Sequence, residues 1–246
     1  MIRKLLIVFA SGLVLSIVLI SVAWVLGGEE LAARIRRDHG DWTFETRDSG
    51  PSVKRNLAFD GNRILTIDAP VSLHFTRGAK TEMTVSGSAR AIDGLRWEDN
   101  ELSFDHHGWW NHRGLTVAIT APQIAGLSLR GPGHIELDDL DQPSLRLEVR
   151  GPADLDASGK VGKLDIDSRG VGSLDLSDVE AGDAKLRVRG VGNVDIKASG
   201  TVDASLNGVG NITLHRKPAS LNAETHGIGE IRHDYDDEKG NAPEDQ

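Results

Sequence analysis

The sequence predicts an all-β protein whose main domain is a right-handed, single-stranded parallel β-helix. A glycine-containing motif recurs six times in the C-terminal half, at spacings of 20, 19, 20, 18 and 19 residues. Apolar residues alternate with period two on both sides of each motif, as in half-buried strands. Residues 120–233 contain no Trp and no Phe, which suits a narrow core of stacked aliphatic side chains. A repeat of this length is typical of a solenoid.

The N-terminal segment predicts a membrane anchor. Residues 1–4 are a short basic tail expected in the cytoplasm, and residues 5–26 contain no charged residue. Twenty-two helical residues extend about 33 Å, enough for a bilayer core of about 30 Å. Ser21-Val22-Ala23 also fits a signal-peptidase site, so a cleaved signal sequence stays open as the alternative. Either reading places the rest of the chain outside the cytoplasm, in the periplasm or at the cell surface.

Residues 27–56 are polar and are predicted to be a linker, and the domain is expected to span residues 57–233. Its first part, residues 57–120, alternates with a period near two, for example at Val71, Leu73 and Phe75. Turn-forming residues interrupt this pattern at short intervals. We therefore expect short antiparallel strands before the solenoid.

The six repeats, within residues 124–233, each predict a strand, a Gly-x-Gly corner and a second strand. The corner glycines are Gly131, Gly133, Gly151, Gly170, Gly172, Gly190, Gly192, Gly208, Gly210, Gly227 and Gly229, with Ala153 as the one departure. A sharp corner favours glycine because glycine adopts positive φ freely, and we expect this at the lead glycine of each copy, such as Gly190. About six coils of about 19 residues would stack. One interior column would then contain Ile135, Leu155, Leu174, Val194, Ile212 and Ile231.

Two of these corners carry a family resemblance. Residues 208–212 read Gly-Val-Gly-Asn-Ile and residues 190–194 read Gly-Val-Gly-Asn-Val. With the upstream stretches 65–79 and 119–133, they resemble the auto-transporter adhesin, head GIN domain family over about residues 57–233. The resemblance implies an exported bacterial β-helix and a role in adhesion. It supplies no binding or catalytic residue. Pro132 and Pro152 in the first two corners depart from the family pattern, as does a His- and Trp-rich insertion at residues 105–114.

A His- and Trp-rich segment at residues 105–114 is the most unusual local composition. His106, His107 and His112 could offer imidazoles to a metal, but adjacent residues of an extended strand point to opposite faces. No metal site and no cofactor are therefore predicted. Trp109 and Trp110 are candidate ligand contacts, through stacking on sugar rings or insertion at a membrane interface. Their structural alternative is a cap on one end of the solenoid.

Two charged columns are expected on the outer surface. The first is a candidate binding site for an anionic polymer or glycan through repeated bidentate contacts, and it consists of Arg130, Arg150, Arg169 and Arg189. The second consists of Glu136, Asp156, Asp175 and Asp195. The alternative for both is a solvated surface on which the two columns partly neutralise each other.

The sequence predicts a non-enzymatic, membrane-anchored protein of the cell envelope that acts in structure, adhesion or surface binding. The expected partners are the membrane, through the N-terminal helix, and a glycan or another envelope component. The net charge of −9 argues against nucleic acid. No hydrolase, metalloprotease or nucleotide-binding motif is present. Two alternatives stay open: a carbohydrate-active β-helix enzyme that uses the acidic column, and a periplasmic sensor that acts through a partner membrane protein. The acidic segment 234–246 is predicted to be a disordered tail.

Overall fold

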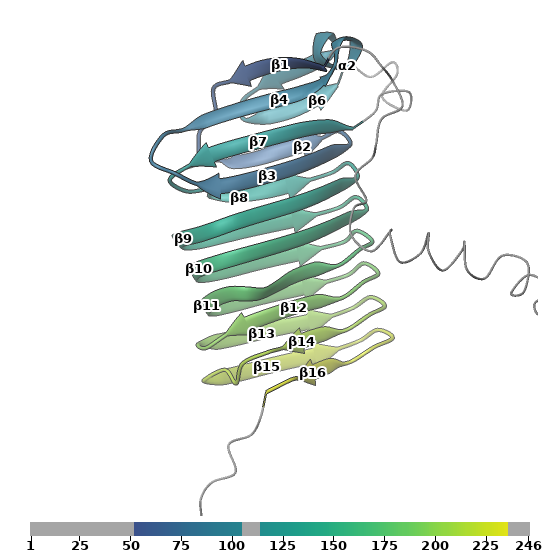
Figure 1. Ribbon diagram of the computed structural model, residues 1–246. Coiled ribbons are helices and arrows are strands. Elements are labelled where there is room, and N and C mark those ends of the chain that lie inside the picture. Colours follow the sequence, from purple (N-terminus) through teal and green to yellow (C-terminus); the bar gives the residue numbers. More distant parts are fainter. Residues whose placement is uncertain (1–51, 105–113, 236–246) are drawn as a thin grey trace, which may run out of the picture. The chain divides into compact units, whose positions relative to one another are not determined.

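The computed structural model describes residues 52–104 and 114–235 (Figure 1). The predicted anchor, the cleavage site and most of the linker lie outside these ranges, as do His106, His107, His112, Trp109, Trp110 and the acidic residues beyond Tyr235. Within the described ranges, no helix has the length and apolarity needed to cross a membrane. The one α-helix described there, α2 (Ala89–Asp93), has five residues.

The C-terminal half is a parallel β-solenoid, as predicted (Figure 1). Its strands are β8 (Gly126–Leu129), β9 (Gly133–Val149), β10 (Ala153–Ser168), β11 (Leu174–Val188), β12 (Val194–Ala198), β13 (Thr201–Leu206), β14 (Ile212–Leu214), β15 (Ser220–Thr225) and β16 (Ile231–His233). The long strands β9, β10 and β11 bend in the middle, so each supplies one leg to either side of the coil. From the first to the last of the six corners, the solenoid makes about five full turns.

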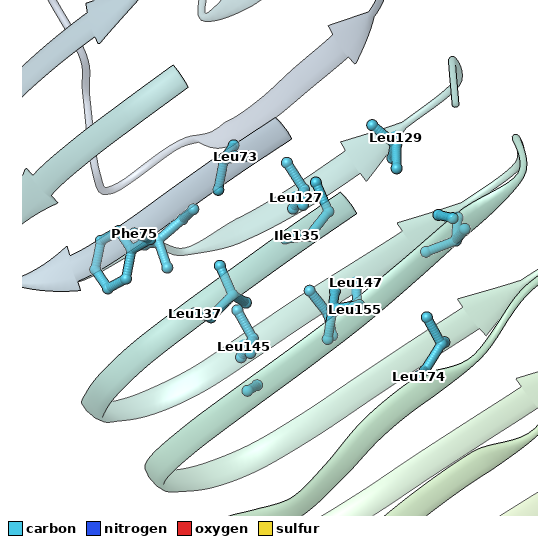
Figure 2. Packing of buried hydrophobic residues seen from close by; sticks show 14 of the residues in the cluster. Leu73, Phe75, Leu127, Leu129, Ile135, Leu137, Leu145, Leu147, Leu155 and Leu174 are labelled. Carbon is cyan, nitrogen blue, oxygen red and sulfur yellow. The ribbon is translucent and has the colours of Figure 1, made fainter. Parts of the chain in front are cut away.

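The predicted interior column is confirmed residue by residue. Leu155 pairs with Ile135 on one side and Leu174 on the other, and the register continues to Val194, Ile212 and Ile231. All but Ile231 are at most 2% exposed. Figure 2 shows the upper part of this column, where the aliphatic side chains point into the space between the two legs of each coil. The period-two pattern therefore predicted both the buried face and the stacking register.

The corner geometry differs from the prediction at one point. Positive φ occurs at the second glycine of the four later corners, for example 148° at Gly192, and not at the lead glycine Gly190. Gly190 is required for another reason: a Cβ atom there would overlap the backbone carbonyl of Gly170 in the preceding coil. Both glycines of the corner are therefore constrained by the close approach of stacked chains, and Gly192 also by its positive φ.

The solenoid begins earlier in the sequence than residue 124, which corrects the prediction for the middle zone. Strand β2 (Ile64–Asp68) pairs in parallel with β6 (Glu101–Phe104) and β8, and β3 (Val71–Arg77) pairs in parallel with β7 (Leu115–Ala121) and β9. A coil of earlier sequence therefore lies between two coils of later sequence. Its corner at Ala69 and Pro70 lacks the Gly-x-Gly motif, so the repeat pattern did not reveal it.

Antiparallel strands lie at the N-terminal end of the solenoid. Strand β4 (Glu82–Ser88) pairs with β7, β1 (Ser52–Leu57) pairs with β4, and β5 (Leu95–Glu98) pairs with β6. The expectation of short antiparallel strands holds for these elements only. Strand β1 also occupies the last residues of the segment predicted as linker.

Candidate binding surface

The four candidate arginines form a column immediately after the strands that lead into the corners. The backbone N–H groups of Arg150 and Arg169 donate to the carbonyls of Leu129 and Val149 in the preceding coil, at 2.8 and 2.7 Å. Arg189 continues the same spacing, with its N–H 2.7 Å from the carbonyl of Ser168. All four side chains are between 43% and 49% exposed. The parallel register thus brings together residues about 19 positions apart in the sequence.

Each of these guanidinium groups contacts a carboxylate. Arg130 lies 3.3 Å from Glu101, and Arg150 lies 2.6 Å from Glu148. These contacts neutralise part of the column's charge. Their carboxylates are not members of the acidic column of Glu136, Asp156, Asp175 and Asp195, with which the solvated-surface alternative paired the arginines. An anionic ligand would have to share each arginine with its carboxylate.

Asp167 binds two arginines of the column at once. Arg169 donates to it from Nη2 at 2.9 Å, and Arg189 donates from the next coil at 2.7 Å. The Asp167 side chain is only 14% exposed. The hydrogen bond from Arg169 and then that from Arg189 lower the pKa of this carboxyl below its usual range, against the opposing effect of burial. Asp167 therefore joins adjacent coils and holds both arginines in place.

An apolar column that the sequence analysis did not single out runs along the edge of the solenoid. The central residues of successive corners pair as isolated parallel bridges, and they are Pro152, Val171, Val191, Val209 and Ile228. The valines are 44% to 56% exposed and Ile228 is 76% exposed. We call these five side chains the corner ridge. Its signal was present in the sequence, because an apolar residue stands at the outward-facing position of every Gly-x-Gly motif.

Polar residues border the corner ridge on the side opposite the arginines. The backbone N–H of Asn211 donates to Asn193 Oδ1 of the preceding coil at 3.2 Å, and the N–H of Glu230 donates to Asn211 Oδ1 at 3.3 Å. The N–H of Ser173 is bound in the same way by Asp154, at 3.1 Å. The edge therefore offers three parallel columns: guanidinium groups, aliphatic side chains, and a mixed polar column of amides, a hydroxyl and the carboxylates of Asp154 and Glu230.

The predicted acidic column is confirmed on the outer surface of the other leg. Glu136, Asp156, Asp175 and Asp195 occupy successive pairing positions of β9 to β12. Two histidines border its first member: His74 Nδ1 lies 2.9 Å from Glu136 and His134 Nε2 lies 3.3 Å from it. The hydrogen bond from His74 contributes most to lowering the pKa of Glu136.

The middle of the acidic column contains two carboxyl groups with opposite pKa shifts. Burial raises the pKa of Asp156, helped by the negative charges of Asp175 and Glu136 and opposed by His134. Hydrogen bonds from the hydroxyl and the backbone N–H of Ser177 lower the pKa of Asp175. In the part of the chain that the structure describes, no group of three or more His, Asp or Glu residues is arranged to hold a metal ion.

A family model and solved structures match the chain. The model described as "Putative auto-transporter adhesin, head GIN domain" matches residues 63–218. A search of curated proteins finds no match. The crystal structure of a "putative adhesin" from Bacteroides fragilis NCTC 9343 is 20% identical, with a TM-score of 0.61, and the match covers 75% of this chain and 98% of that one. This likeness supports the fold.

Two structures from Parabacteroides distasonis ATCC 8503 are more distant. One, a "putative lipid binding protein", is 15% identical with a TM-score of 0.41, and the match covers 75% of this chain and 97% of that one. The other, a "putative adhesin", is 14% identical with a TM-score of 0.36, and the match covers 75% of this chain and 98% of that one.

Proposed function

Because the chain belongs to the auto-transporter adhesin, head GIN domain family, we propose that it is a non-enzymatic binding protein of the cell envelope, acting outside the cytoplasm. Residues 5–26 would hold it at the membrane as an uncleaved anchor. The family assignment supports an adhesion or surface role. The observation that carries the binding role is the corner ridge with its border of stacked arginines.

The ligand we propose is an extended acidic glycan of the envelope, lying along the corner ridge. Parallel coils repeat about every 4.8 Å, so the edge presents ligand contacts at regular intervals, with arginines at the first four corners and Asn207 and His226 in their place at the last two. The valines would contact the apolar C–H faces of sugar rings. The arginines would bind carboxylate or sulfate groups, and the asparagines would bind hydroxyls.

The arginines keep donors for such a ligand in spite of their ion pairs. A guanidinium group has five N–H donors. Arg150 uses Nε and Nη2 on Glu148, whereas Arg189 uses only Nη2 on Asp167. Because Glu148 and Asp167 fix the orientation of the guanidinium groups, little side-chain entropy remains to be lost on binding.

A glycan array probed with the full-length protein in mild detergent tests this proposal. The triple variant Arg150→Ala, Arg169→Ala, Arg189→Ala should weaken binding at least about tenfold, since it removes several charge-assisted contacts. The control triple is Arg146→Ala, Lys160→Ala, Lys185→Ala. It removes the same charge from cations that also contact carboxylates but lie away from the corners, and it should change binding less than about twofold. Equal losses in both triples, or no binding to any acidic glycan, would contradict the proposal.

The same assay separates binding from the enzymatic alternative. Release of shortened or unsaturated sugar products, abolished by Asp156→Asn or Asp175→Asn, would indicate a carbohydrate-active enzyme that uses the acidic column. Binding without product release supports the proposed role. Stable co-purification of a membrane protein, with no glycan bound, would favour the sensor alternative.

A further inference from the structure

The two ends of the solenoid differ in the elements that cover their cores. At the N-terminal end, β1, β4 and β5 pair antiparallel with the outer strands, and α2 packs beside them (Figure 1). At the C-terminal end, β15 pairs only with β13, and β16 pairs only with β14, among the strands that the structure describes. Both final strands therefore present one edge of backbone N–H and C=O groups without a strand partner. Such edges are templates for pairing with another chain.

The same coil also exposes side chains that are buried in the coils above it. Leu221 and Ala223 pair with Val202 and Ala204, which are 0% and 1% exposed. Leu221 itself is 36% exposed, and Ala223 is exposed as well. Tyr235 packs against the core and covers part of it. Residues 236–246 contain no large apolar side chain, so their composition is unsuited to covering the remainder.

The geometry restricts what can cover this end. The open edges of β15 and β16 belong to the two opposite legs of one coil. An extended peptide pairs with one edge and leaves the other open. A partner that satisfies both must carry two strands at the same separation, which is a property of another solenoid end. The N-terminal end of a second copy also has two edge strands, β1 and β5, each with a single partner among the strands that the structure describes. Joining a C-terminal end to an N-terminal end would leave one end of each kind open and continue as a filament, whereas joining two C-terminal ends closes the assembly.

We infer that the C-terminal coil is a homodimer interface, in which two copies join tail to tail through β15 and β16 about a twofold axis. The axis runs parallel to the strands and passes Ile228, the centre of the last corner. It places β16 of one copy antiparallel to β15 of the other. Because the open edges of β15 and β16 are then paired in both copies, the assembly is a closed dimer and not a filament.

The residues of the last coil are complementary under this symmetry. Thr225 ends β15 three residues before Ile228, and Ile231 begins β16 three residues after it. Residues equidistant from Ile228 therefore meet: Glu224 with Arg232 of the second copy, and Leu221 with Tyr235 of the second copy. The first pair joins opposite charges and the second joins apolar surfaces.

The other possible twofold axis, perpendicular to the strands, fits less well. It would pair β16 with its own copy and place Arg232 opposite Arg232. Like charges directly opposite each other destabilise a strand pair. Within one copy, Arg232 contacts Glu230, the residue just before β16. Both side chains are more than half exposed, so they are accessible to a partner.

The end face is large enough for a specific dimer. A six-residue strand is about 20 Å long, and packed sheets lie about 10 Å apart. With side chains included, the end covers about 500 Å² per copy. The total of about 1,000 Å² reaches the lower bound for specific interfaces, and the continuous strand pairing adds backbone hydrogen bonds on both legs.

Analytical ultracentrifugation of the full-length protein in mild detergent tests the interface. We expect a dimer for the native sequence. Glu224→Arg should raise the dissociation constant at least about tenfold, and Glu224→Arg combined with Arg232→Glu should restore it to within about threefold, because the swap recreates the opposite-charge pair. A monomer at all concentrations, oligomers larger than a dimer, or a dimer unaffected by Glu224→Arg would overturn the inference.

Disulfide cross-linking tests the symmetry axis independently. The chain contains no cysteine, so a single introduced cysteine reports one position. Ile228→Cys should form a covalent dimer under mild oxidation, since it lies on the axis, and a disulfide requires Cα atoms about 4.4–6.8 Å apart. Val191→Cys is the matched control, because it occupies the same exposed corner position two coils away and should stay monomeric in denaturing gels. Equal cross-linking of both variants would contradict this axis. Neither measurement involves a glycan, so the dimer and the proposed binding role can fail separately.

Discussion

The carboxylate of Asp167 lies 2.7 Å from the guanidinium Nη2 of Arg189, which belongs to the next coil of the solenoid. Arg169, two residues after Asp167, reaches the same carboxylate at 2.9 Å. This arrangement adds a side-chain link to the backbone hydrogen bonds that join β10 and β11. It also lies beside the corner ridge, so the proposed ligand binding would depend on the same groups as stability.

We expect Asp167→Asn to lower the free energy of unfolding by about 1–2 kcal/mol at pH 7, because a largely buried carboxylate with two charged partners is lost. The folded-state pKa of Asp167 lies below its unfolded value. Its contribution is therefore complete above about pH 4 and declines as the pH falls through the folded-state pKa. Urea unfolding at pH 7 and pH 3 measures both effects. Asp165→Asn is the control, since its contacts with Arg146 and Arg187 are 3.7 Å long and more exposed. If Asp165→Asn lowered the free energy of unfolding as much as Asp167→Asn does, the special role of Asp167 would be contradicted.

The corner at residues 190–192 predicts a steep ranking of three neighbouring substitutions. Gly192→Ala should destabilise most, by at least about 3 kcal/mol, because it combines a positive φ of 148° with overlap of the Gly172 carbonyl. Gly190→Ala introduces only an overlap with the Gly170 carbonyl, so it should destabilise the fold less than Gly192→Ala. Val191→Ala, at an exposed position, should change stability by less than about 0.5 kcal/mol. Thermal unfolding of the three variants checks the order. Similar melting temperatures for all three would contradict the close stacking of the corners.

Two adjacent members of the acidic column should respond in opposite directions. The pKa of Asp156 is raised by burial and by neighbouring carboxylates, so its ionisation opposes folding as the pH rises through and above its unfolded pKa. Asp156→Asn should therefore raise the melting temperature at pH 7. The pKa of Asp175 is lowered by Ser177, so Asp175→Asn should lower the melting temperature. Shifts of the same sign in both variants would show that burial and the Ser177 hydrogen bonds do not determine the pKa values of these two carboxyl groups.

The N-terminal segment carries a prediction about location. We expect the full-length protein to stay in the membrane fraction after a carbonate wash, because residues 5–26 are long enough to span a bilayer. Replacing Leu13 and Val14 with Arg should release it, since charges in the centre of a span are costly. A mature N-terminus at Trp24, found by mass spectrometry, would instead show a cleaved signal sequence.

The repeat made most of the solenoid predictable, because one pattern fixed both the buried face and the stacking. Leu155 and Leu174 hold the same place in successive copies, and the structure pairs them directly. The coil of β2 and β3 was not predictable in this way. Its residues alternate like those of the other coils, but Ala69 and Pro70 replace the glycine corner. Its neighbours, β7 and β9, are also separated from it by long stretches of sequence.

The candidate surface was predicted in part. Counting positions from Gly151 and Gly170 correctly placed Arg150 and Arg169 in one column, because parallel register preserves such offsets. Their carboxylate partners were harder to predict. Arg169 and Arg189, from two adjacent coils, both donate to Asp167, and such contacts depend on side-chain torsions that the repeat pattern does not specify. The exposure of Val191 follows from its outward position between two glycines. An apolar residue normally suggests the core, so the sequence did not single out that column as a surface feature.

The insertion of β3 between β7 and β9 makes the domain mechanically polar. A force that pulls on Tyr235 away from the solenoid meets coils that touch only their immediate neighbours, so they can peel away in chain order. Each coil of about 19 residues would release about 65 Å of extended chain. This sequence of steps must stop at β3, because β3 is held by β9 on one side and by β7, more than 35 residues further along the chain, on the other. The C-terminal coils therefore act as an extensible series, and the interleaved layer acts as the clamp at its end.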